Sequence, residues 1–199
     1  MKLLVDADYV VYKCCASAEN EIDFGDDVIV VTSKFSDALG CVRRELKKIA
    51  QNFFDPEMIL FFSDSKNFRK TIQPAYKGHR NRKKPCGYKR VINTLSDEYK
   101  VVVQSTLEAD DAMGIAATAE PGNVICSPDK DMRQIPGTLF DMKETVNVTL
   151  IEGNRWHLIQ TLAGDQTDGY AGVPGIGVKR AVALFEEKGY TWKTCLEAF

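Results

Sequence analysis

The 199-residue chain lacks several features that would place it in a common class of protein. No apolar stretch approaches the roughly 18 residues that a membrane-spanning helix needs, and the opening MKLLVDADYV has neither a basic lead-in nor a cleavage site. The six cysteines include no C-x-x-C pair, and His79 and His157 stand in no zinc-like spacing. We therefore expect a cytoplasmic, globular protein with buried thiols, no membrane association and no zinc site.

Acidic residues are absent from one long segment. Between Ser65 and Arg90 the chain has ten Lys or Arg residues and no Asp or Glu. The rest of the chain keeps 16 of the 26 basic residues and all 28 acidic residues, which gives it a net charge of −12. Because Phe68, Tyr76 and Tyr88 stand among the cations, this basic segment predicts contact with a nucleic acid, whose phosphates attract cations and whose bases stack on aromatic rings.

Short apolar runs alternate with segments of helical periodicity. The runs expected to form strands are residues 2–5, 58–62, 100–103, 123–126, 138–141 and 146–150. Residues 22–31 are expected to form a hairpin or an edge strand around Gly25, and the apolar spacing from Phe35 to Phe53 predicts an amphipathic helix. Strands separated by helices favour an α/β fold with a mainly parallel, doubly wound sheet.

Acidic residues follow the expected strands or begin the expected helices. They form five clusters: Asp6 with Asp8; Asp64; Glu108 with Asp110 and Asp111; Asp129 with Asp131; and Asp165 with Asp168. Because the carboxyl ends of parallel strands meet at one edge of a sheet, we expect the clusters to converge there. Gathered carboxylates repel one another unless they are protonated or neutralised by a hard cation, and a ligand set made only of oxygens points to Mg²⁺ or Mn²⁺.

Each cluster also has an ordinary structural explanation. Asp6 is typical of a turn, and Asp129 is typical of a helix N-cap. Asp165 and Asp168 are typical of a turn closed by side-chain hydrogen bonds, and the acids at 108–111 are typical of the first turn of a helix. Five clusters in order along an α/β chain, with the basic segment between the second and the third, favour a shared site over five separate caps.

Residues 172–177 (GVPGIG) cannot continue a helix and are expected to form a tight turn between helices. The glycines at 172, 175 and 177 would let phosphates approach main-chain N–H groups, as in a helix-hairpin-helix element. Lys179 and Arg180 would add phosphate contacts. A dinucleotide-binding loop is disfavoured, because no strand precedes the turn and Pro174 interrupts the pattern.

Five stretches occur in an order that is specific in combination. They are LLVDAD (3–8), SDSKNFRKTIQPAYKGHR (63–80), LEADDAMG (107–114), SPDKDMRQI (127–135) and LAGDQTDGYAGVPGIGVKRAVALF (162–185). In these stretches the chain resembles the 5′-nuclease superfamily, which contains flap endonucleases, phage 5′-3′ exonucleases and the 5′-nuclease domain of bacterial repair polymerases. The resemblance implies a PIN-like nuclease core over 1–153 that includes a basic arch at 65–90. It also implies a helix-two-turn-helix DNA-binding element over 154–199, which relatives usually extend further.

The resemblance also implies a set of metal ligands. Asp6, Asp64, Glu108 and Asp110 would hold one Mg²⁺ or Mn²⁺ ion. A second ion would be held, in part through water, by Asp111, Asp129, Asp131, Asp165 and Asp168. Asp8 lies outside this set and is expected to be a turn residue or a hydrogen-bond acceptor. In the family, a turn like that at 172–177 often holds a monovalent ion by its carbonyls, which implies K⁺ there.

The same resemblance implies roles for residues of the basic segment. Lys77 and Arg80 match the family's basic pair above the metals, and their i, i+3 spacing would place both on one helix face near the scissile phosphate. Tyr76 is expected to stack on a base of the frayed end, with packing inside the arch as the alternative. The remaining expected phosphate contacts in this segment are Arg69, Lys70, Arg82, Lys83 and Lys84.

The expected function is metal-dependent hydrolysis of phosphodiester bonds at DNA 5′ ends, flaps or RNA primers paired with DNA. We expect a monomer that works in a bacterial or phage-infected cell. A haloacid-dehalogenase-type phosphatase with Asp6 as its nucleophile is an alternative, but it leaves the acids from Glu108 to Asp131 and the basic segment without a role. A non-catalytic nucleic-acid scaffold is the second alternative, and it would not require every expected acid.

Overall fold

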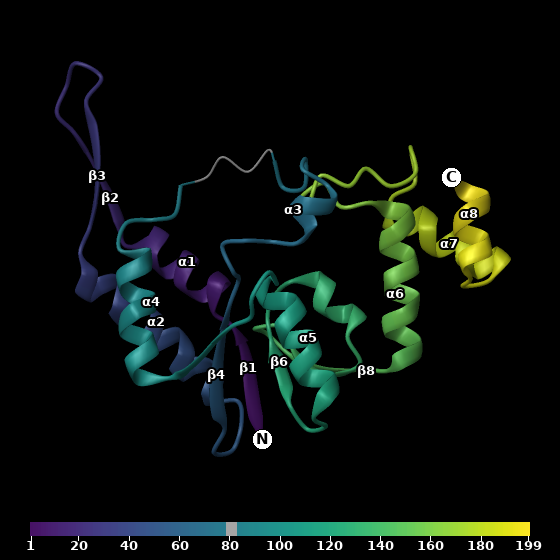
Figure 1. The fold of residues 1–199 in the computed structure, drawn as a ribbon, viewed down its shortest axis with the longest axis horizontal. Helices are drawn as coiled ribbons and strands as arrows, with labels where there is room; N and C mark the ends of the chain where they lie inside the picture. Colours follow the sequence, from purple (N-terminus) through teal and green to yellow (C-terminus); the bar gives the residue numbers. More distant parts are fainter. Residues whose placement is uncertain (79–82) are drawn as a thin grey trace.

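The structure of the protein is a computed structural model that describes residues 1–78 and 83–199. Its centre is a six-stranded sheet (Figure 1). In chain order the strands are β1 (Lys2–Asp6), β4 (Glu57–Phe62), β5 (Lys100–Val103), β6 (Val124–Cys126), β7 (Gly137–Phe140) and β8 (Thr145–Val148). Arg80, Arg82 and His79 lie outside the described residues, and so do the roles predicted for the two arginines.

The sheet is mainly parallel, as the sequence predicts. Its strand order is β5-β4-β1-β6-β7-β8, and β8 is the one strand of this sheet that pairs antiparallel to its neighbour. The apolar runs predicted as strands all lie in it, with ends shifted by a few residues. Because β1 lies between β4 and β6, the carboxyl ends of these three strands meet at one edge of the sheet.

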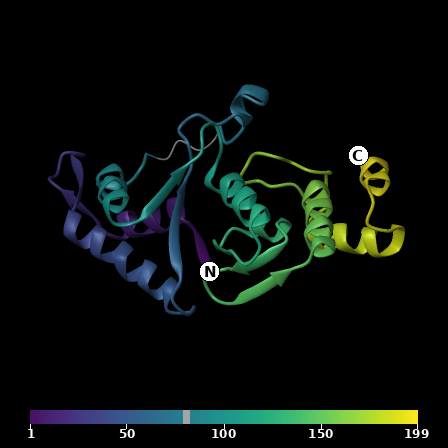
Figure 2. The same cartoon turned by 60° about the horizontal axis from the view of Figure 1, so that its bottom comes forward.

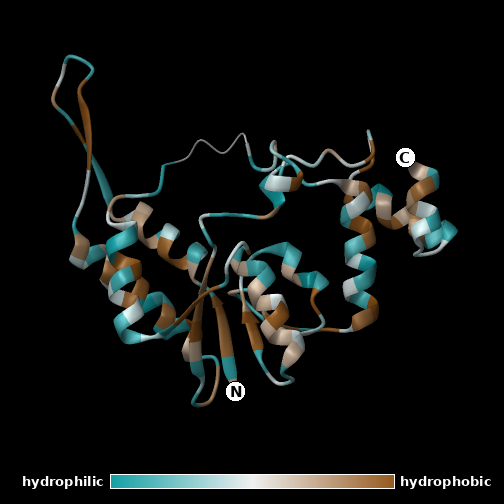
Figure 3. Cartoon of the chain, viewed as in Figure 1, coloured by the Kyte–Doolittle hydropathy of each residue, from teal (hydrophilic) through white to brown (hydrophobic). Residues whose placement is uncertain are grey.

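Helices cover both faces of the sheet, as a parallel sheet requires (Figure 2). Leu3 and Val5 of β1 belong to the core formed with α1 (Ala7–Ser17), α2 (Phe35–Ala50) and α4 (Tyr88–Glu98). Leu4, which points to the other face, belongs to the core formed with α5 (Ala109–Ala119). Figure 3 shows the resulting apolar colour along the central strands. Because side chains alternate between the two faces of β1, this strand contributes apolar residues to both cores.

The hairpin expected around Gly25 is confirmed. Strands β2 (Glu19–Asp23) and β3 (Ile29–Ser33) pair antiparallel and extend away from the rest of the molecule (Figure 1). The helix predicted from Phe35 to Phe53 is confirmed as α2, although it ends at Ala50. Among the described residues, no helix combines the length and the apolar character needed to cross a membrane.

The basic segment contains less helix than the spacing of Lys77 and Arg80 suggests. Helix α3 (Arg69–Ile72) has a single turn and ends two residues before Pro74. Lys77 has a φ of +52°, which is a left-handed backbone conformation and not a helical one. The prediction that Lys77 lies on a helix face is therefore wrong. Pro74 disfavours the α conformation of Gln73, where α3 ends, and the Lys77 N–H donates to the Asp168 carbonyl at 3.4 Å instead of to a carbonyl one helical turn back.

A third core belongs to the C-terminal helices α6 (Leu150–Ala163), α7 (Val178–Lys188) and α8 (Trp192–Ala198). Helix α6 begins at a capping box in which Thr149 and Glu152 bond each other's backbone N–H groups. It packs on η1 (Lys130–Gln134), a short 3₁₀ helix after β6. The predicted division at 153/154 falls within α6, and the two-part organisation stays a prediction.

The turn at 172–177 closes a loop that begins directly after α6. Val173 N–H donates to the Leu162 carbonyl at 2.9 Å, and Gly172, with a φ of +63°, packs against the backbone of Gly164. A Cβ at Gly172 would lie 2.4 Å from the Gly164 nitrogen. Packing within the chain thus requires this glycine, while its predicted contact with nucleic acid stays a prediction.

We expect Gly172→Ala to lower the free energy of unfolding by about 2 kcal/mol or more, because the added methyl group meets backbone atoms and the left-handed φ is strained. Gly40→Ala is the matched control. Gly40 lies inside α2, where a Cβ would meet only the flexible Arg44 side chain at 3.4 Å, so this change should raise stability by roughly 0.5–1 kcal/mol. Urea unfolding of both variants measures the difference, and equal stabilities would contradict the packing argument.

Candidate active site

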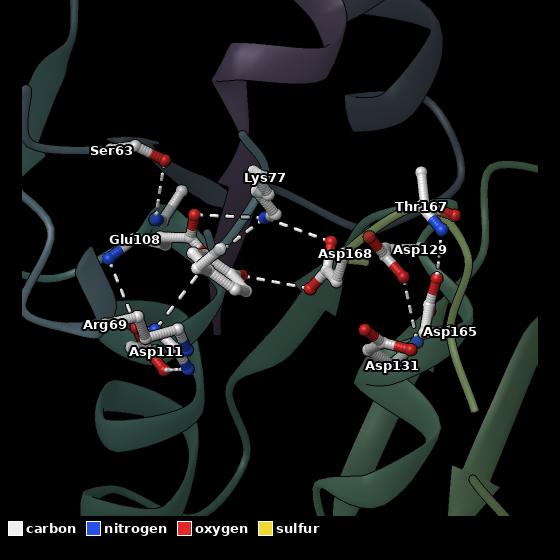
Figure 4. A network of polar contacts seen from close by, with 12 residues as sticks. Ser63, Arg69, Lys77, Glu108, Asp111, Asp129, Asp131, Asp165, Thr167 and Asp168 are labelled. Atoms are coloured by element: carbon white, nitrogen blue, oxygen red, sulfur yellow. Dashed lines mark hydrogen bonds and ion pairs between the residues drawn. The ribbon is translucent and has the colours of Figure 1, made fainter. Parts of the chain in front are cut away.

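A cavity of about 970 Å³ opens where the carboxyl ends of β1, β4 and β6 meet. Eight of the nine acids predicted as metal ligands line it: Asp6, Glu108, Asp110, Asp111, Asp129, Asp131, Asp165 and Asp168. They lie at the end of β1, at the start of α5, in the segment after β6 and in the loop after α6. Figure 4 shows the acids of the last two segments together with Glu108 and Asp111. The structure thus brings together acids that are up to 162 positions apart in the sequence.

Asp64 is the predicted ligand that does not line the cavity. Its Oδ2 accepts a hydrogen bond from the Thr106 N–H at 2.8 Å, and its own N–H donates to the Leu107 carbonyl at 3.0 Å. Backbone donors, first that of Thr106, hold the pKa of Asp64 below its ordinary value. Asp64 therefore ties the loop after β4 to the loop before α5, and the structure does not place it with the other acids.

Several of the cavity acids also cap the helices that begin beside the cavity. Asp6 is the N-cap of α1, where it accepts from Tyr9 N–H at 3.1 Å, and Glu108 with Asp111 forms the capping box of α5. Asp129 caps η1 by accepting from Asp131 N–H at 2.9 Å. The ordinary explanations and the shared site are therefore compatible, because each cap leaves its carboxylate at the rim or wall of the cavity.

Burial raises the pKa values of the innermost acids. Asp6 is 8% exposed, and burial together with the nearby Asp8 and Asp129 raises its pKa to about 6, against the hydrogen bonds from Tyr9 and Ser127. Burial, reinforced by the charges of Asp6 and Asp129, raises the pKa of Asp110 to about 8. Asp129 shifts in the same direction, chiefly through burial. These acids resist ionisation unless a cation joins them.

Cations from two parts of the chain neutralise the outer acids. Arg69 forms a bidentate pair with Asp111, at 2.6 and 2.7 Å, which outweighs burial and lowers the pKa of that carboxyl. Lys130 donates to Asp165. Although burial opposes the effect, this bond and those from Thr167 lower the pKa of Asp165 to about 2. All four residues of these two pairs line the cavity.

Tyr76 and Lys77 line the cavity, and Figure 4 shows Lys77 between Glu108 and Asp168. Lys77 Nζ lies 3.0 Å from Glu108 Oε1 and 3.4 Å from Asp168 Oδ1, so it bridges two acids that are 60 positions apart. The Tyr76 hydroxyl lies 2.9 Å from both Glu108 Oε2 and Asp168 Oδ2, and with one proton it donates to one of them at a time. In the described part of the chain, no three Asp, Glu, His or Cys side chains lie close enough together to hold a metal ion.

The other predicted nucleic-acid contacts are spread more widely. Arg69, Tyr76 and Lys84 line the cavity, and Arg180 donates to the Gly175 carbonyl at 2.7 Å in the turn before α7. Tyr76 points inward at the acids, which is the arrangement expected of a packing residue. The described cations of this set that do not line the cavity are Lys70, Lys83, Lys179 and Arg180. Gly177 is the N-cap of α7 and leaves open space around its Cα.

The structure adds a contact that the sequence analysis did not find. Tyr88 donates to Asp8 Oδ1 at 2.5 Å, while Ser63 N–H donates to Asp8 Oδ2 at 2.8 Å. Lys84 Nζ lies 4.5 Å from the centre of the Tyr88 ring, which directs it to the cavity rim. Asp8 is thus a hydrogen-bond acceptor that anchors the end of the basic segment. Its only sequence signal is its position two residues after Asp6.

Comparison with known proteins identifies a family and relatives whose sequences resemble this chain. Residues 2–156 match the family model described as 5′-3′ exonuclease, N-terminal resolvase-like domain. The exodeoxyribonuclease of Enterobacteria phage T3 is 32% identical over 190 residues, an alignment that covers 88% of this chain and 63% of that protein. The chain therefore spans less than two thirds of the length of this relative.

Solved structures share the fold. The T5 5′-exonuclease with bound zinc superimposes with a TM-score of 0.66 at 16% identity, over 94% of this chain and 75% of that one. A T5 D15 flap endonuclease complex with DNA and metal ions gives a TM-score of 0.63 at 15% identity, over 94% and 75% of the two chains. The predicted α/β fold with its C-terminal helices is thereby confirmed.

The pKa values of Asp110 and Asp6, about 8 and about 6, predict that the metal-free protein loses stability as the pH rises. From pH 6 to pH 9 the folded state still holds protons that the unfolded chain, with an ordinary Asp value of 3.8, has already released. The free energy of unfolding should therefore fall across this window, and since one pKa unit corresponds to about 1.4 kcal/mol, the fall should reach a few kcal/mol.

Urea unfolding in EDTA at several pH values measures this dependence. Asp110→Asn should remove most of it, because the variant has no proton to lose at that position. Asp97→Asn, at an exposed position of α4, should keep it. A free energy of unfolding that is constant or rises from pH 6 to pH 9 in the unaltered protein would contradict the buried-acid argument.

Proposed function

Since the chain belongs to the family of 5′-3′ exonuclease N-terminal, resolvase-like domains, we propose that it is a divalent-metal-dependent 5′-nuclease. Its substrates would be DNA 5′ ends, flaps or RNA primers paired with DNA. The observation that carries the proposal is the convergence of eight predicted ligands in one cavity, where Tyr76 and Lys77 contact Glu108. The T3 relative is named an exodeoxyribonuclease, which supports the same class of reaction.

We propose that the cavity acids hold two Mg²⁺ or Mn²⁺ ions. All the candidate ligands are carboxylate oxygens, which hard divalent cations prefer. The T5 5′-exonuclease structure contains divalent metal ions, namely zinc, and the T5 flap endonuclease complex contains metal ions. Bound ions of this kind activate water and stabilise the leaving oxygen in phosphodiester hydrolysis. For the acids to become ligands, Lys77 must leave Glu108 and Asp168, and Lys130 must leave Asp165. These lysines then become available to a phosphate.

The basic segment supports a nucleic-acid substrate. Lys77 and Arg69 lie at the cavity, and Lys84 lies at its rim. We propose that Lys77, together with Arg80, contacts the scissile phosphate, that Tyr76 stacks on a terminal base after leaving the acids, and that the 172–177 turn grips the duplex around a K⁺ ion. The related T5 complex contains DNA. We further propose that the protein acts as a monomer.

The phosphatase alternative receives no support from the surroundings of Asp6. Both of its carboxylate oxygens accept hydrogen bonds, one from Tyr9 N–H and one from Ser127 Oγ at 2.9 Å, and the residue is buried. Asp6 also shares the cavity with seven other predicted ligands, for which a phosphatase with an Asp6 nucleophile has no role. The scaffold alternative is separated from the nuclease by the experiment below.

Cleavage of 5′-labelled flap, nicked, blunt and RNA-DNA substrates tests the proposal. We expect short products in Mg²⁺, none in EDTA, and a loss of at least 10³-fold in rate for Asp129→Asn combined with Asp131→Asn, because removing ligands weakens metal binding. Asp97→Asn is the control and should cleave normally. Cleavage that persists in EDTA or in the double variant would refute the metal assignment, and a folded protein that binds DNA without cutting it would favour the scaffold.

Lys77→Ala tests two proposed roles of this lysine, its pairing with the cavity acids and its contact with the phosphate. Without its charge between Glu108 and Asp168, Mn²⁺ should bind several-fold more tightly, as measured by electron paramagnetic resonance, because a competing cation is gone. Turnover should nevertheless fall, since the charge no longer reaches the phosphate. Lys47→Ala, on the exposed face of α2, should change neither quantity. Unchanged Mn²⁺ affinity in the Lys77 variant would contradict the competition between lysine and metal.

A further inference from the structure

An uncharged side chain from the C-terminal helices reaches one of the cavity acids. Gln160 of α6 donates from Nε2 to Asp131 Oδ1 at 2.5 Å, although the two residues are 29 positions apart. Gln160 is 9% exposed, and its helix neighbours Leu158, Ile159 and Leu162 belong to the third hydrophobic core. A buried amide among apolar residues costs free energy unless its polar atoms are paired, so this position requires an explanation.

The pairing continues away from the cavity. Gln134 Nε2 donates to Gln160 Oε1 at 2.5 Å, and Gln134 Oε1 lies 2.8 Å from His157 Nδ1. Three hydrogen bonds thus connect Asp131, at the cavity, with His157 on the exposed side of α6. We call the side chains of Asp131, Gln160, Gln134 and His157 the amide relay.

The relay has one consistent direction. An ionised carboxylate only accepts hydrogen bonds, so Gln160 must present its NH₂ group to Asp131 and its carbonyl oxygen to Gln134. Gln134 must then donate to Gln160, which leaves its own carbonyl oxygen for a donor on His157. Reversing either amide would bring two acceptor oxygens into contact. The donor side of Gln160 is therefore fixed toward the acid.

Close packing of α6 on η1 fixes the distance that the amide relay spans. Gly153 of α6 packs against η1 so closely that a Cβ there would lie 2.5 Å from the Gln134 carbonyl oxygen. Helix α6 and η1 thus approach as near as their main chains allow, which brings Gln160 within reach of both Gln134 and Asp131. His157 also lies edge-on to Trp192 of α8, with ring centres 5.5 Å apart.

We infer that Gln160 is a positioning residue, which orients the Asp131 carboxylate for a divalent ion through the donor that the relay directs at it. The inference rests on the proposed function, because it takes Asp131 as a metal ligand. Hydrogen bonds behind a ligand fix its orientation, and their removal typically costs 10–100-fold in metal affinity or activity. Helix α6, which leads to the 172–177 turn, thereby also sets the geometry of the metal centre.

Gln160→Met tests the inference, since methionine matches the length of glutamine and fills the same space without an N–H donor. We expect Mn²⁺ binding, followed by electron paramagnetic resonance, to weaken by about 10-fold or more. At a fixed low Mg²⁺ concentration kcat should fall by a similar factor, while KM for DNA changes less than about twofold and high Mn²⁺ restores kcat. Gln104→Met, at an exposed position after β5, is the control and should behave like the unaltered protein.

Gln134→Met provides a second variant if Gln160→Met does not fold. It leaves the donor on Gln160 but removes the group that directs it, so Mn²⁺ binding should weaken by a smaller factor of about three to ten. A folded Gln160→Met or Gln134→Met protein that binds Mn²⁺ as the unaltered protein does would overturn the inference and leave the proposed function standing. An unaltered protein that binds no Mn²⁺ and cuts no DNA would overturn both.

Discussion

Repulsion among carboxylates at one edge of a parallel sheet is the constraint on which this site depends. Eight of the predicted ligands and Asp8 line one cavity, and burial raises the pKa of Asp6 and Asp110 to about 6 and about 8. Three cations oppose this repulsion: Arg69 pairs with Asp111, Lys77 with Glu108 and Asp168, and Lys130 with Asp165. A buried group of like charges is stable only when cations or protons compensate it, so the cavity can exchange internal cations for external ones.

Several of the same acids also satisfy backbone N–H groups, which favours their placement at this edge of the sheet. The N–H groups at helix starts lack partners within their own helix, and a carboxylate beside them satisfies those donors and interacts favourably with the helix dipole. Asp6, Glu108 and Asp129 stand at the starts of α1, α5 and η1. Helices that start at the carboxyl ends of parallel strands therefore bring caps, and hence charges, to the same place.

The sequence reveals those parts of the site that local patterns encode. Apolar runs identify the strands, parallel order predicts that acids after β1 and β6 meet, and both outcomes hold. Contacts between distant side chains leave no such pattern. Tyr88 lies 80 positions from Asp8, and Gln160 sits in an apolar stretch of α6 where nothing indicates that it faces an acid. Asp64 follows a buried strand as Asp6 does, yet the Thr106 N–H, 42 positions away, draws its carboxylate out of the cavity.

The arrangement divides the site into two halves with different supports. Asp6 and Asp110 belong to the sheet and to α5, and the rigid core beneath β1 fixes them. Asp131, Asp165 and Asp168 depend on α6, through Gln160, through the loop that begins at Gly164, and through the close packing of Gly153 on η1. Lys77 and Tyr76 bridge the halves by contacting both Glu108 and Asp168. Because the bridge comes from the basic segment, the proposed contact of Lys77 with a phosphate would remove one internal cation from both halves. Substrate binding would then favour metal binding, and metal binding would favour substrate binding.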